Sequence, residues 1–344
     1  MKHQTLQQDG ISRLPLWRGL ILFLGLVLGW MLVAEFIART PLGSELPPPS
    51  VGADSFEFDI KVFYLEQSIR QNGPLDCLIV GDSMTNNGLD PNLISQAYEA
   101  QTGVSLHCFN FGMPALTLDA SGPLAQALAN HFHPRLLIFV LSQRDFEIEY
   151  GHPFRHVATT DWTEYNLGKT SMRGWAVNSL YGYRYYLFTQ YWLNPANRVS
   201  FSNAWRDITS RGFSPIFGFR NPPKIFPPNT TFNTDDPAAA QGFKGLLDIQ
   251  NGTTSLLIVD APLQPSYYQI VLGTPEDYAR SYVEPMQAYF EPLHIPFWLT
   301  RELSLSIPDQ AWHDSLHVNE NGVPIFSAWL GRELAKDYPS DFFK

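Results

Sequence analysis

A short apolar run that leads into a serine constrains this chain more than any other feature of its sequence. Residues 77–86 read Cys-Leu-Ile-Val-Gly-Asp-Ser-Met-Thr-Asn. Three apolar residues, then glycine and polar turn-forming residues, predict a buried parallel strand that delivers Ser83 to the edge of a sheet. Open α/β sheets bind their ligands at the carboxyl edge of the strands. The tripeptide Gly-Asp-Ser is short, so a strand followed by an ordinary polar turn stays open as the alternative.

This strand is the first of a series that alternates with helices. Strands are predicted at 76–80, 105–111, 136–141, 255–260 and 296–300, and helices near 90–102, 119–131, 275–289 and 322–338. Such alternation calls for a parallel sheet of about five strands with helices on its faces.

The alternation is interrupted between residues 146 and 252. This segment is rich in tryptophan and tyrosine and, in its later part, in proline. A loop of about 100 residues without structure of its own is uncommon, so we expect an inserted subdomain with a helix near 177–193. Its aromatic residues pack a small core of their own, line a ligand cleft, or contact a membrane interface, where Trp and Tyr concentrate.

The N-terminal segment predicts a membrane anchor. Residues 1–18 are mostly polar with three basic residues, and residues 19–38 contain no charge except Glu35. About 20 apolar residues suffice for a helix to cross a bilayer, and basic residues before them favour a cytoplasmic N-terminus and an exported domain, periplasmic or at the cell surface. A cleaved signal peptide is the alternative, but the run is long for one and no small-x-small site follows it. Residues 39–55, with three consecutive prolines, are expected to link the anchor to a domain at 56–344.

Composition argues against two classes of protein. The formal net charge is −10 and no long basic run occurs, whereas a nucleic-acid partner requires a positive face. Two cysteines are too few for a disulfide-rich scaffold. Cys77 and Cys108 fall on neighbouring predicted strands, and we expect them to be buried small hydrophobic residues, since strand-to-strand geometry rarely suits a bridge. If the domain is extracytoplasmic, a disulfide between them stays open.

A base for the serine is found far along the chain. A serine nucleophile needs a base within hydrogen-bond reach, and that base needs an orienting group. His317 can serve as the base, and Asp314, three residues earlier, lies on the same side of a helical or turn-like segment. His313 is a rival base, but as the neighbour of Asp314 it should point elsewhere. In isolation this segment also fits a solvated surface loop.

Three motifs together resemble the SGNH/GDSL hydrolase superfamily. They are Gly81-Asp82-Ser83 after the first strand, Asn110-x-Gly112 after the second, and Asp314-x-x-His317 before the last helix. Their order matches the family's blocks one, two and five over about 76–338, less the insertion. The resemblance implies a flavodoxin-like three-layer α/β/α fold. It also implies a serine esterase or acyltransferase that works without a metal or cofactor.

The resemblance also implies roles at the matching positions. Ser83 is expected to be the nucleophile, His317 the general base, and Asp314 its orienting partner. The N–H groups of Ser83 and Gly112 are expected to form two parts of an oxyanion hole. Asp82 and Asn110 are expected to contact the substrate.

The chain departs from the family in block three. The family usually has Gly-x-Asn-Asp there, and this chain has Ser142-Gln143-Arg144-Asp145. Arg144, or Gln143 beside it, is then expected to donate to the oxyanion or to contact the substrate. Otherwise the hole is incomplete and the domain binds without reacting, or Arg144 pairs with Asp145 or Asp82.

An anchored, exported domain with an altered block three resembles the anchored members of the superfamily. Several of these add or remove O-acyl groups on cell-envelope polymers, so an acyl ester or acylated glycan is the expected substrate. Two alternatives stay open: a non-catalytic partner of an integral-membrane acyltransferase, and a scaffold whose aromatic insertion is the working surface. A hydrolase and a transferase share the acyl-enzyme, so the sequence does not separate them.

Overall fold

A five-stranded, all-parallel sheet forms the centre of the molecule. The computed structural model describes residues 16–40, 43, 45–146, 154–219, 237–250, 252–267 and 273–343. The strands follow the order β2-β1-β3-β4-β5. They are β1 (Cys77–Gly81), β2 (Cys108–Asn110), β3 (Leu136–Leu141), β4 (Ser255–Asp260) and β5 (Phe297–Trp298). The predicted α/β fold with about five parallel strands is therefore confirmed.

The helices between the strands pack on one another in pairs. α4 (Pro91–Thr102) contacts α15 (Val323–Asp337), and α5 (Leu118–Phe132) contacts α10 (Pro237–Gln250). The second pair packs closely because a Cβ on Gly122 would lie 2.1 Å from the carbonyl oxygen of Gly242. Further helices are α2 (Phe56–Asn72), α3 (Ser83–Gly88), α12 (Pro275–Tyr278), α13 (Glu284–Phe290) and α14 (Arg301–Ser306).

Local sequence explains where α4 begins and ends. The Asp90 carboxylate accepts the N–H of Asn92 at 2.8 Å, and Pro91 occupies the first helical position. Both are favoured at helix starts, because the cap satisfies an orphan N–H and proline has none to lose. Gly103 ends the helix in the left-handed region, with φ 74°.

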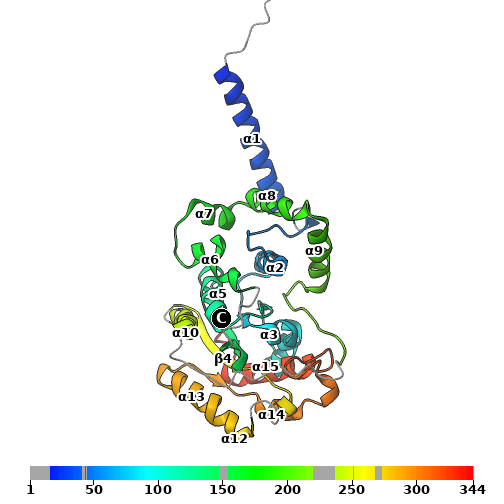
Figure 1. The fold of residues 1–344 in the computed structure, drawn as a ribbon, viewed down its shortest axis with the longest axis vertical. Helices are drawn as coiled ribbons and strands as arrows, with labels where there is room; N and C mark the ends of the chain where they lie inside the picture. Colours follow the sequence, from blue (N-terminus) through cyan, green and yellow to red (C-terminus); the bar gives the residue numbers. More distant parts are fainter. Residues whose placement is uncertain are drawn as a thin grey trace, which may run out of the picture.

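The N-terminal helix α1 (Leu16–Arg39) projects from the domain (Figure 1). Its residues Trp17–Arg39 are long and apolar enough to cross a membrane, and the rest of the molecule covers none of the apolar window. The segment that follows is not a free tether where the structure describes it. Pro48 and Pro49 are buried, and the Val51 N–H donates to the Asp59 carboxylate at 2.9 Å.

The region predicted as an insertion contains five α-helices among its described residues, of which α10 (Pro237–Gln250) is the helix that packs on α5 before β4. The other four belong to its aromatic-rich part. These are α6 (Asp161–Asn166), α7 (Met172–Ser179), α8 (Tyr181–Trp192) and α9 (Pro195–Asp207). The single helix predicted near 177–193 is thus interrupted at Leu180, which ends α7 and caps α8. α7 and α8 lie at the base of α1 (Figure 1). Residues 147–153 and 220–236 of the predicted insertion lie outside the described residues.

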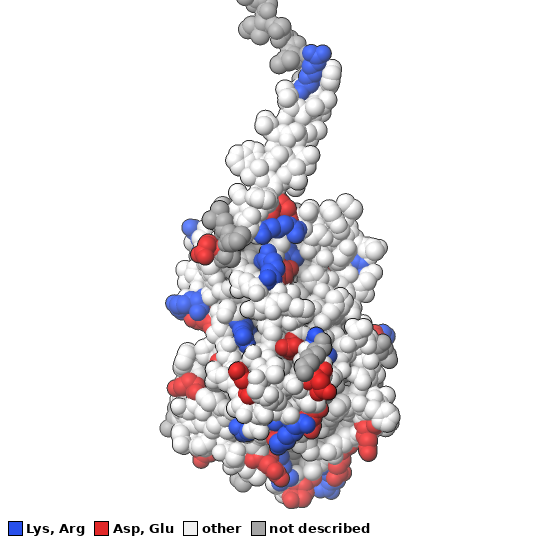
Figure 2. All heavy atoms as spheres, turned by 180° about the vertical axis from the view of Figure 1, so that it is seen from behind, with Lys and Arg blue, Asp and Glu red and all other residues white. Residues whose placement is uncertain are grey.

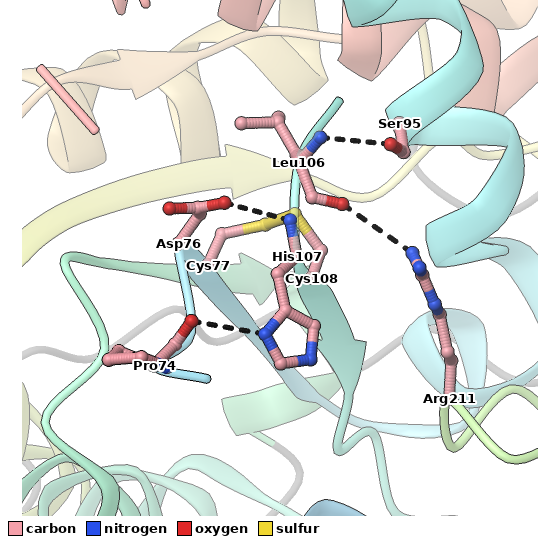
Figure 3. The surroundings of a disulfide bond; sticks show 8 residues. All are labelled: Pro74, Asp76, Cys77, Ser95, Leu106, His107, Cys108 and Arg211. Carbon is pink, nitrogen blue, oxygen red and sulfur yellow. Dashed lines mark hydrogen bonds between the residues drawn. A yellow bond between two sulfur atoms is a disulfide. The ribbon is translucent and has the colours of Figure 1, made fainter. Parts of the chain in front are cut away.

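Cys77 and Cys108 form a disulfide (Figure 3). The expectation of two buried thiols is therefore wrong. The two residues are direct register partners on the neighbouring strands β1 and β2, and their Cα atoms are 4.5 Å apart. This separation is within the range that a disulfide spans.

Candidate active site

The candidate site lies at the carboxyl edge of the sheet, beside β1 and β3. The order of strands reverses between these two, since β2 lies on one side of β1 and β3, β4 and β5 lie on the other. Such a reversal leaves a crevice outside the strand ends, where open α/β sheets bind ligands. Ser83 is the first residue of α3, directly after β1. Asp314 and His317 belong to the segment between α14 and α15.

The structure brings these three side chains into one hydrogen-bonded chain. Ser83 Oγ lies 2.8 Å from His317 Nε2, although 234 positions separate the two residues. His317 Nδ1 lies 2.8 Å from Asp314 Oδ1. A ring nitrogen that faces a carboxylate carries the proton, so the lone pair of Nε2 is directed at the Ser83 hydroxyl. His317 is therefore positioned to accept the hydroxyl proton.

Asp314 is held as a carboxylate. Its Oδ1 also accepts the backbone N–H groups of Leu316 and His317, each at 2.9 Å. Burial alone would raise the pKa of Asp314, but the hydrogen bond and charge of His317 and these N–H donors outweigh burial, and the pKa of Asp314 is lowered. An ionised carboxylate here can stabilise the imidazolium that forms when His317 takes up a proton.

Two glycines allow α3 to pack against the sheet. A Cβ on Gly81 would lie 2.2 Å from Thr85 Oγ1 and 2.7 Å from the Val140 carbonyl oxygen. A Cβ on Gly112 would lie 2.4 Å from the backbone nitrogen of Asn86. The Asp82 carboxylate caps α3 by accepting the Met84 N–H at 2.8 Å. Residues of the first two motifs thus build the turn that presents Ser83.

A cavity of about 240 Å³ opens over the serine and the histidine. Its lining consists of Asp82, Ser83, Ala115, Leu116, Arg144, Leu316 and His317. Arg144 enters it from a short 3₁₀ helix, η2 (Gln143–Phe146), that follows β3. Ala115 and Leu116 could not be recognised as lining residues from the sequence, because neither carries a polar group. Ala115 adopts a φ of 53°, an uncommon conformation for a residue with a side chain.

No family model matches the sequence, and no curated protein matches it. Function must therefore be argued from the geometry of the site. Among the residues that the structure describes, no group of three or more His, Cys, Asp or Glu side chains is placed to hold a metal ion.

Asn110 and Gly112 lie behind the cavity and do not line it. The Asn110 amide nitrogen donates to the carbonyl oxygens of Thr85 and Leu89, both at 2.7 Å, and its Oδ1 accepts the Gly112 N–H at 2.8 Å. The Gly112 N–H is thus already engaged in this structure. Asn110 ties the loop after β2 to α3, and its expected contact with substrate stays a prediction.

The block-three residues occupy different environments. Gln143 is buried and, unlike Arg144, is not part of the cavity lining. Asp145 is fully buried, and its carboxylate accepts the Ser142 N–H at 2.6 Å and hydroxyl at 3.0 Å. Burial, followed by the neighbouring charge of Asp82, raises the pKa of Asp145 well above its usual value. Burial also raises the pKa of Asp82, and the charges of His317 and Arg144 offset this only in part.

Sequence reasoning missed a buried lysine beneath the site. Lys61 Nζ donates to Asn86 Oδ1 at 2.6 Å and to the Gly112 carbonyl oxygen at 2.5 Å. Burial lowers the pKa of Lys61 to about 8, an effect that the charge of Glu57 partly offsets. The lysine thereby joins α3, which carries Ser83, to the loop after β2. Its position could have been noticed in the sequence, because Lys61 lies three residues after Phe58, on the same apolar face of the helix α2.

Proposed function

We propose that this chain is an SGNH/GDSL-type serine enzyme that cleaves or transfers a carboxylic acyl ester through an acyl-enzyme on Ser83. The observation that carries the proposal is the hydrogen-bonded chain Ser83–His317–Asp314, in which serine and histidine open onto one cavity. A hydroxyl, an imidazole and an ionised carboxylate in this order form the general arrangement for activating a serine.

In the first half-reaction Ser83 Oγ attacks the acyl carbonyl carbon while His317 Nε2 accepts the hydroxyl proton. Asp314 stabilises the imidazolium through Nδ1. When the tetrahedral intermediate collapses, the bond to the alcohol oxygen breaks and His317 returns the proton to that oxygen. In the second half-reaction water or a sugar hydroxyl attacks the acyl-enzyme and gives its proton to His317. The bond between the acyl carbon and Ser83 Oγ then breaks, and His317 returns the proton to Ser83 Oγ. Release of a free acid defines a hydrolase, and formation of a new ester defines a transferase.

We assign stabilisation of the oxyanion to Arg144 and the Ser83 N–H. As the first residue of a helix, Ser83 has an N–H without an intrahelical partner. Arg144 lines the same cavity, and a guanidinium can donate to an oxyanion or hold an anionic group of the substrate. Gly112 can contribute only if its N–H leaves the Asn110 side chain.

The family assignment includes a flavodoxin-like arrangement of three layers. The strand order supports it, because a parallel sheet ordered 2-1-3-4-5 is the order of that fold. Right-handed crossovers also support it. The chain moves from β1 to β2 in one direction and from β2 to β3 in the other, so α4 and α5 cover opposite faces.

We propose that α1 spans a membrane with the N-terminus in the cytoplasm, and that the domain acts outside it on acylated material of the cell envelope. Three basic residues precede the apolar run. The disulfide between Cys77 and Cys108 supports an oxidising compartment, because cytosolic thiols are kept reduced.

A second candidate is a non-catalytic partner of an integral-membrane acyltransferase. It is favoured by one observation, the engagement of the Gly112 N–H by Asn110, which leaves the oxyanion hole with a donor fewer than the family pattern implies. This candidate predicts that the cavity binds an acylated glycan without turning it over.

Hydrolysis of a chromogenic short-chain acyl ester by the full-length protein in detergent separates the two candidates. The proposal predicts turnover by wild type and a loss on the order of 10⁴-fold or more in Ser83→Ala, as for other triad serines. Circular dichroism of both proteins controls for folding. An inert wild type, or a Ser83→Ala variant as fast as wild type, would rule out the enzyme.

A further inference from the structure

The last turn of α1 is fastened to the corner between α7 and α8. Glu35 Oε2 accepts the N–H of Gly182, at the start of α8, at 2.9 Å. Arg39 donates to the carbonyl oxygen of Ser179, at the end of α7, at 2.7 Å, and its Nε donates to Glu35 Oε1 at 2.7 Å. The last turn of α1 and this corner therefore lie at the same height along the axis of α1.

Buried contacts hold this corner rigidly. The Tyr181 ring packs with Ala38 of α1 and Phe63 of α2 in one apolar cluster, and its hydroxyl donates to Glu66 at 2.5 Å. Arg184 is almost fully buried and donates to both oxygens of Glu66, at 2.9 and 2.8 Å. Breaking a buried ion pair of this kind costs several kcal/mol, typically about 3–5. Buried contacts thus tie α1, α2 and α8 to one another.

The face of α8 that contains Gly182 is largely apolar, with one exposed polar residue, Thr189, seven positions after Gly182. Residues four and eleven positions after Gly182, namely Tyr186 and Leu193, lie on the same face as Gly182. Tyr186 is 58% exposed and Leu193 is 80% exposed. Since Gly182 contacts α1, this face of α8 looks toward the end of the molecule from which α1 projects.

α7 also carries exposed apolar residues on the face that contains its contact with α1. Met172 and Trp175 lie seven and four positions before Ser179, which receives the Arg39 hydrogen bond. Met172 is 81% exposed and Trp175 is 44% exposed. In Figure 2 one shoulder beside α1 is mostly uncharged, whereas basic and acidic side chains lie directly below α1 and at the end of the domain remote from it. Exposed apolar side chains on both helices therefore surround the base of α1.

The length of α1 sets the level of this surface relative to a bilayer. The uncharged stretch between Arg18 and Glu35 contains 16 residues and spans roughly 24 Å at about 1.5 Å per residue. A hydrocarbon core is about 30 Å thick, and the headgroup region adds roughly 5–7 Å on each side. The boundary of the hydrocarbon core then falls at about Glu35, the residue that contacts the start of α8.

We propose that the outward faces of α7 and α8 rest in the interfacial layer of the bilayer that α1 crosses, with Met172, Trp175, Tyr186 and Leu193 inserted among the lipids. The inference rests on the anchoring proposed above. Continuity with α1 argues for a lipid surface as the occupant, because the start of α8 contacts α1 at Glu35, near the expected boundary of the hydrocarbon core. Aromatic and aliphatic residues of this kind concentrate at membrane interfaces. The domain is consequently held at one fixed angle to the membrane.

Single labelled cysteines test this in the full-length protein reconstituted into phosphatidylcholine vesicles. Both native cysteines are in the disulfide, so an introduced cysteine alone carries a nitrobenzoxadiazole fluorophore. The test position is Leu193→Cys. The matched control is Leu305→Cys, an exposed leucine (65%) on α14, at the opposite end of the domain (Figure 1). Leu24→Cys, within α1, reports on anchoring itself.

Quenching by lipids with a spin label near the headgroup should be at least threefold stronger at position 193 than at 305, with blue-shifted emission at 193. Position 24 should be quenched most by a label deep in the acyl chain. If 24 is quenched but 193 behaves like 305, the inference is wrong and anchoring stands. If position 24 also escapes quenching, α1 does not cross the bilayer. The proposed anchoring and the interfacial position of α7 and α8 are then both wrong. Ester hydrolysis by Ser83 is independent of either result.

Discussion

Two serine–histidine hydrogen bonds of nearly equal length occur at opposite edges of the sheet. At the carboxyl edge Ser83 Oγ lies 2.8 Å from His317 Nε2, and at the amino edge Ser68 Oγ lies 2.7 Å from His107 Nε2. A serine near a histidine is therefore no sign of catalysis by itself.

The group on the second ring nitrogen separates the two pairs. His317 Nδ1 faces the carboxylate of Asp314 at 2.8 Å, whereas His107 Nδ1 faces the carbonyl oxygen of Pro74 at 3.0 Å (Figure 3). A carboxylate stabilises an imidazolium far better than a neutral carbonyl does. Burial also lowers the pKa of His107, so its charged form is disfavoured.

The position of each serine on its element differs as well. Ser83 starts a helix at a strand end and lines a cavity. Ser68 lies inside α2 and is buried. A cavity at the amino edge is lined by His107 but not by Ser68, and Ser68 has no free helix start beside it. At the amino edge the same residue types hold β1, β2 and α2 together. The candidate site is therefore defined by the carboxylate on the second ring nitrogen and by a cavity that the serine itself lines.

Replacing His317 and His107 in turn should give the largest difference in activity between the two serine–histidine pairs. His317→Ala is expected to lower ester hydrolysis at least a thousandfold, because the serine loses its base. His107→Ala should change activity per folded molecule less than twofold. The measurement is kcat/KM for both variants after their folded fraction has been determined by near-ultraviolet circular dichroism. Equal losses in the two variants would contradict the distinction drawn here.

Two arginines give the next comparison. Arg144→Ala should lower kcat roughly 100- to 1,000-fold, the usual cost of losing one oxyanion donor, and Arg144→Lys should recover only part of it because a point charge does not reproduce a guanidinium. Arg211, which donates to the Leu106 carbonyl oxygen at the amino edge (Figure 3), should be dispensable for turnover. An effect of Arg144→Ala confined to KM would assign this residue to substrate binding instead.

The disulfide should affect stability without affecting chemistry. Replacing both Cys77 and Cys108 by alanine removes a bridge across 31 positions, which should lower the free energy of unfolding by about 3–4 kcal/mol. Chemical denaturation measures this loss. Activity of the folded variant at low temperature should equal that of wild type, since the bridge lies at the amino ends of β1 and β2. A parallel loss of kcat would show that the two edges are not separable.

A buried carboxylate at the carboxyl edge, Asp260, should affect only how the free energy of unfolding depends on pH. Asp260, at the end of β4, accepts the Tyr278 hydroxyl at 3.1 Å, and burial raises its pKa from 3.8 to about 8. Its stabilising contribution is therefore complete below pH 4 and is lost as the pH rises to 8. Between pH 5 and 8, Asp260→Asn should make the fall in unfolding free energy shallower by up to about 1.4 kcal/mol per pH unit. The exposed Asp207→Asn is the control, and an unchanged slope in Asp260→Asn would refute the assignment.

Features set by local sequence were the ones that could be predicted. The strand series, the apolar helix α1 and the cap of α4 follow from periodicity and from Asp90 and Pro91. Asp314 and His317 are linked by their spacing, and the strand order carries Ser83 to the same edge. What could not be predicted depends on partners distant in sequence. The register that aligns Cys77 with Cys108, and the contacts of Asn110, form only after the sheet has assembled.

Covalent labelling with a fluorophosphonate probe tests the central claim most directly. The full-length protein in detergent is incubated with the probe, and the modified peptide is identified by mass spectrometry. The account predicts one label on Ser83, equal labelling of Ser68→Ala and wild type, and no label on Ser83→Ala. An unlabelled wild type, or a label that persists in Ser83→Ala, would contradict it.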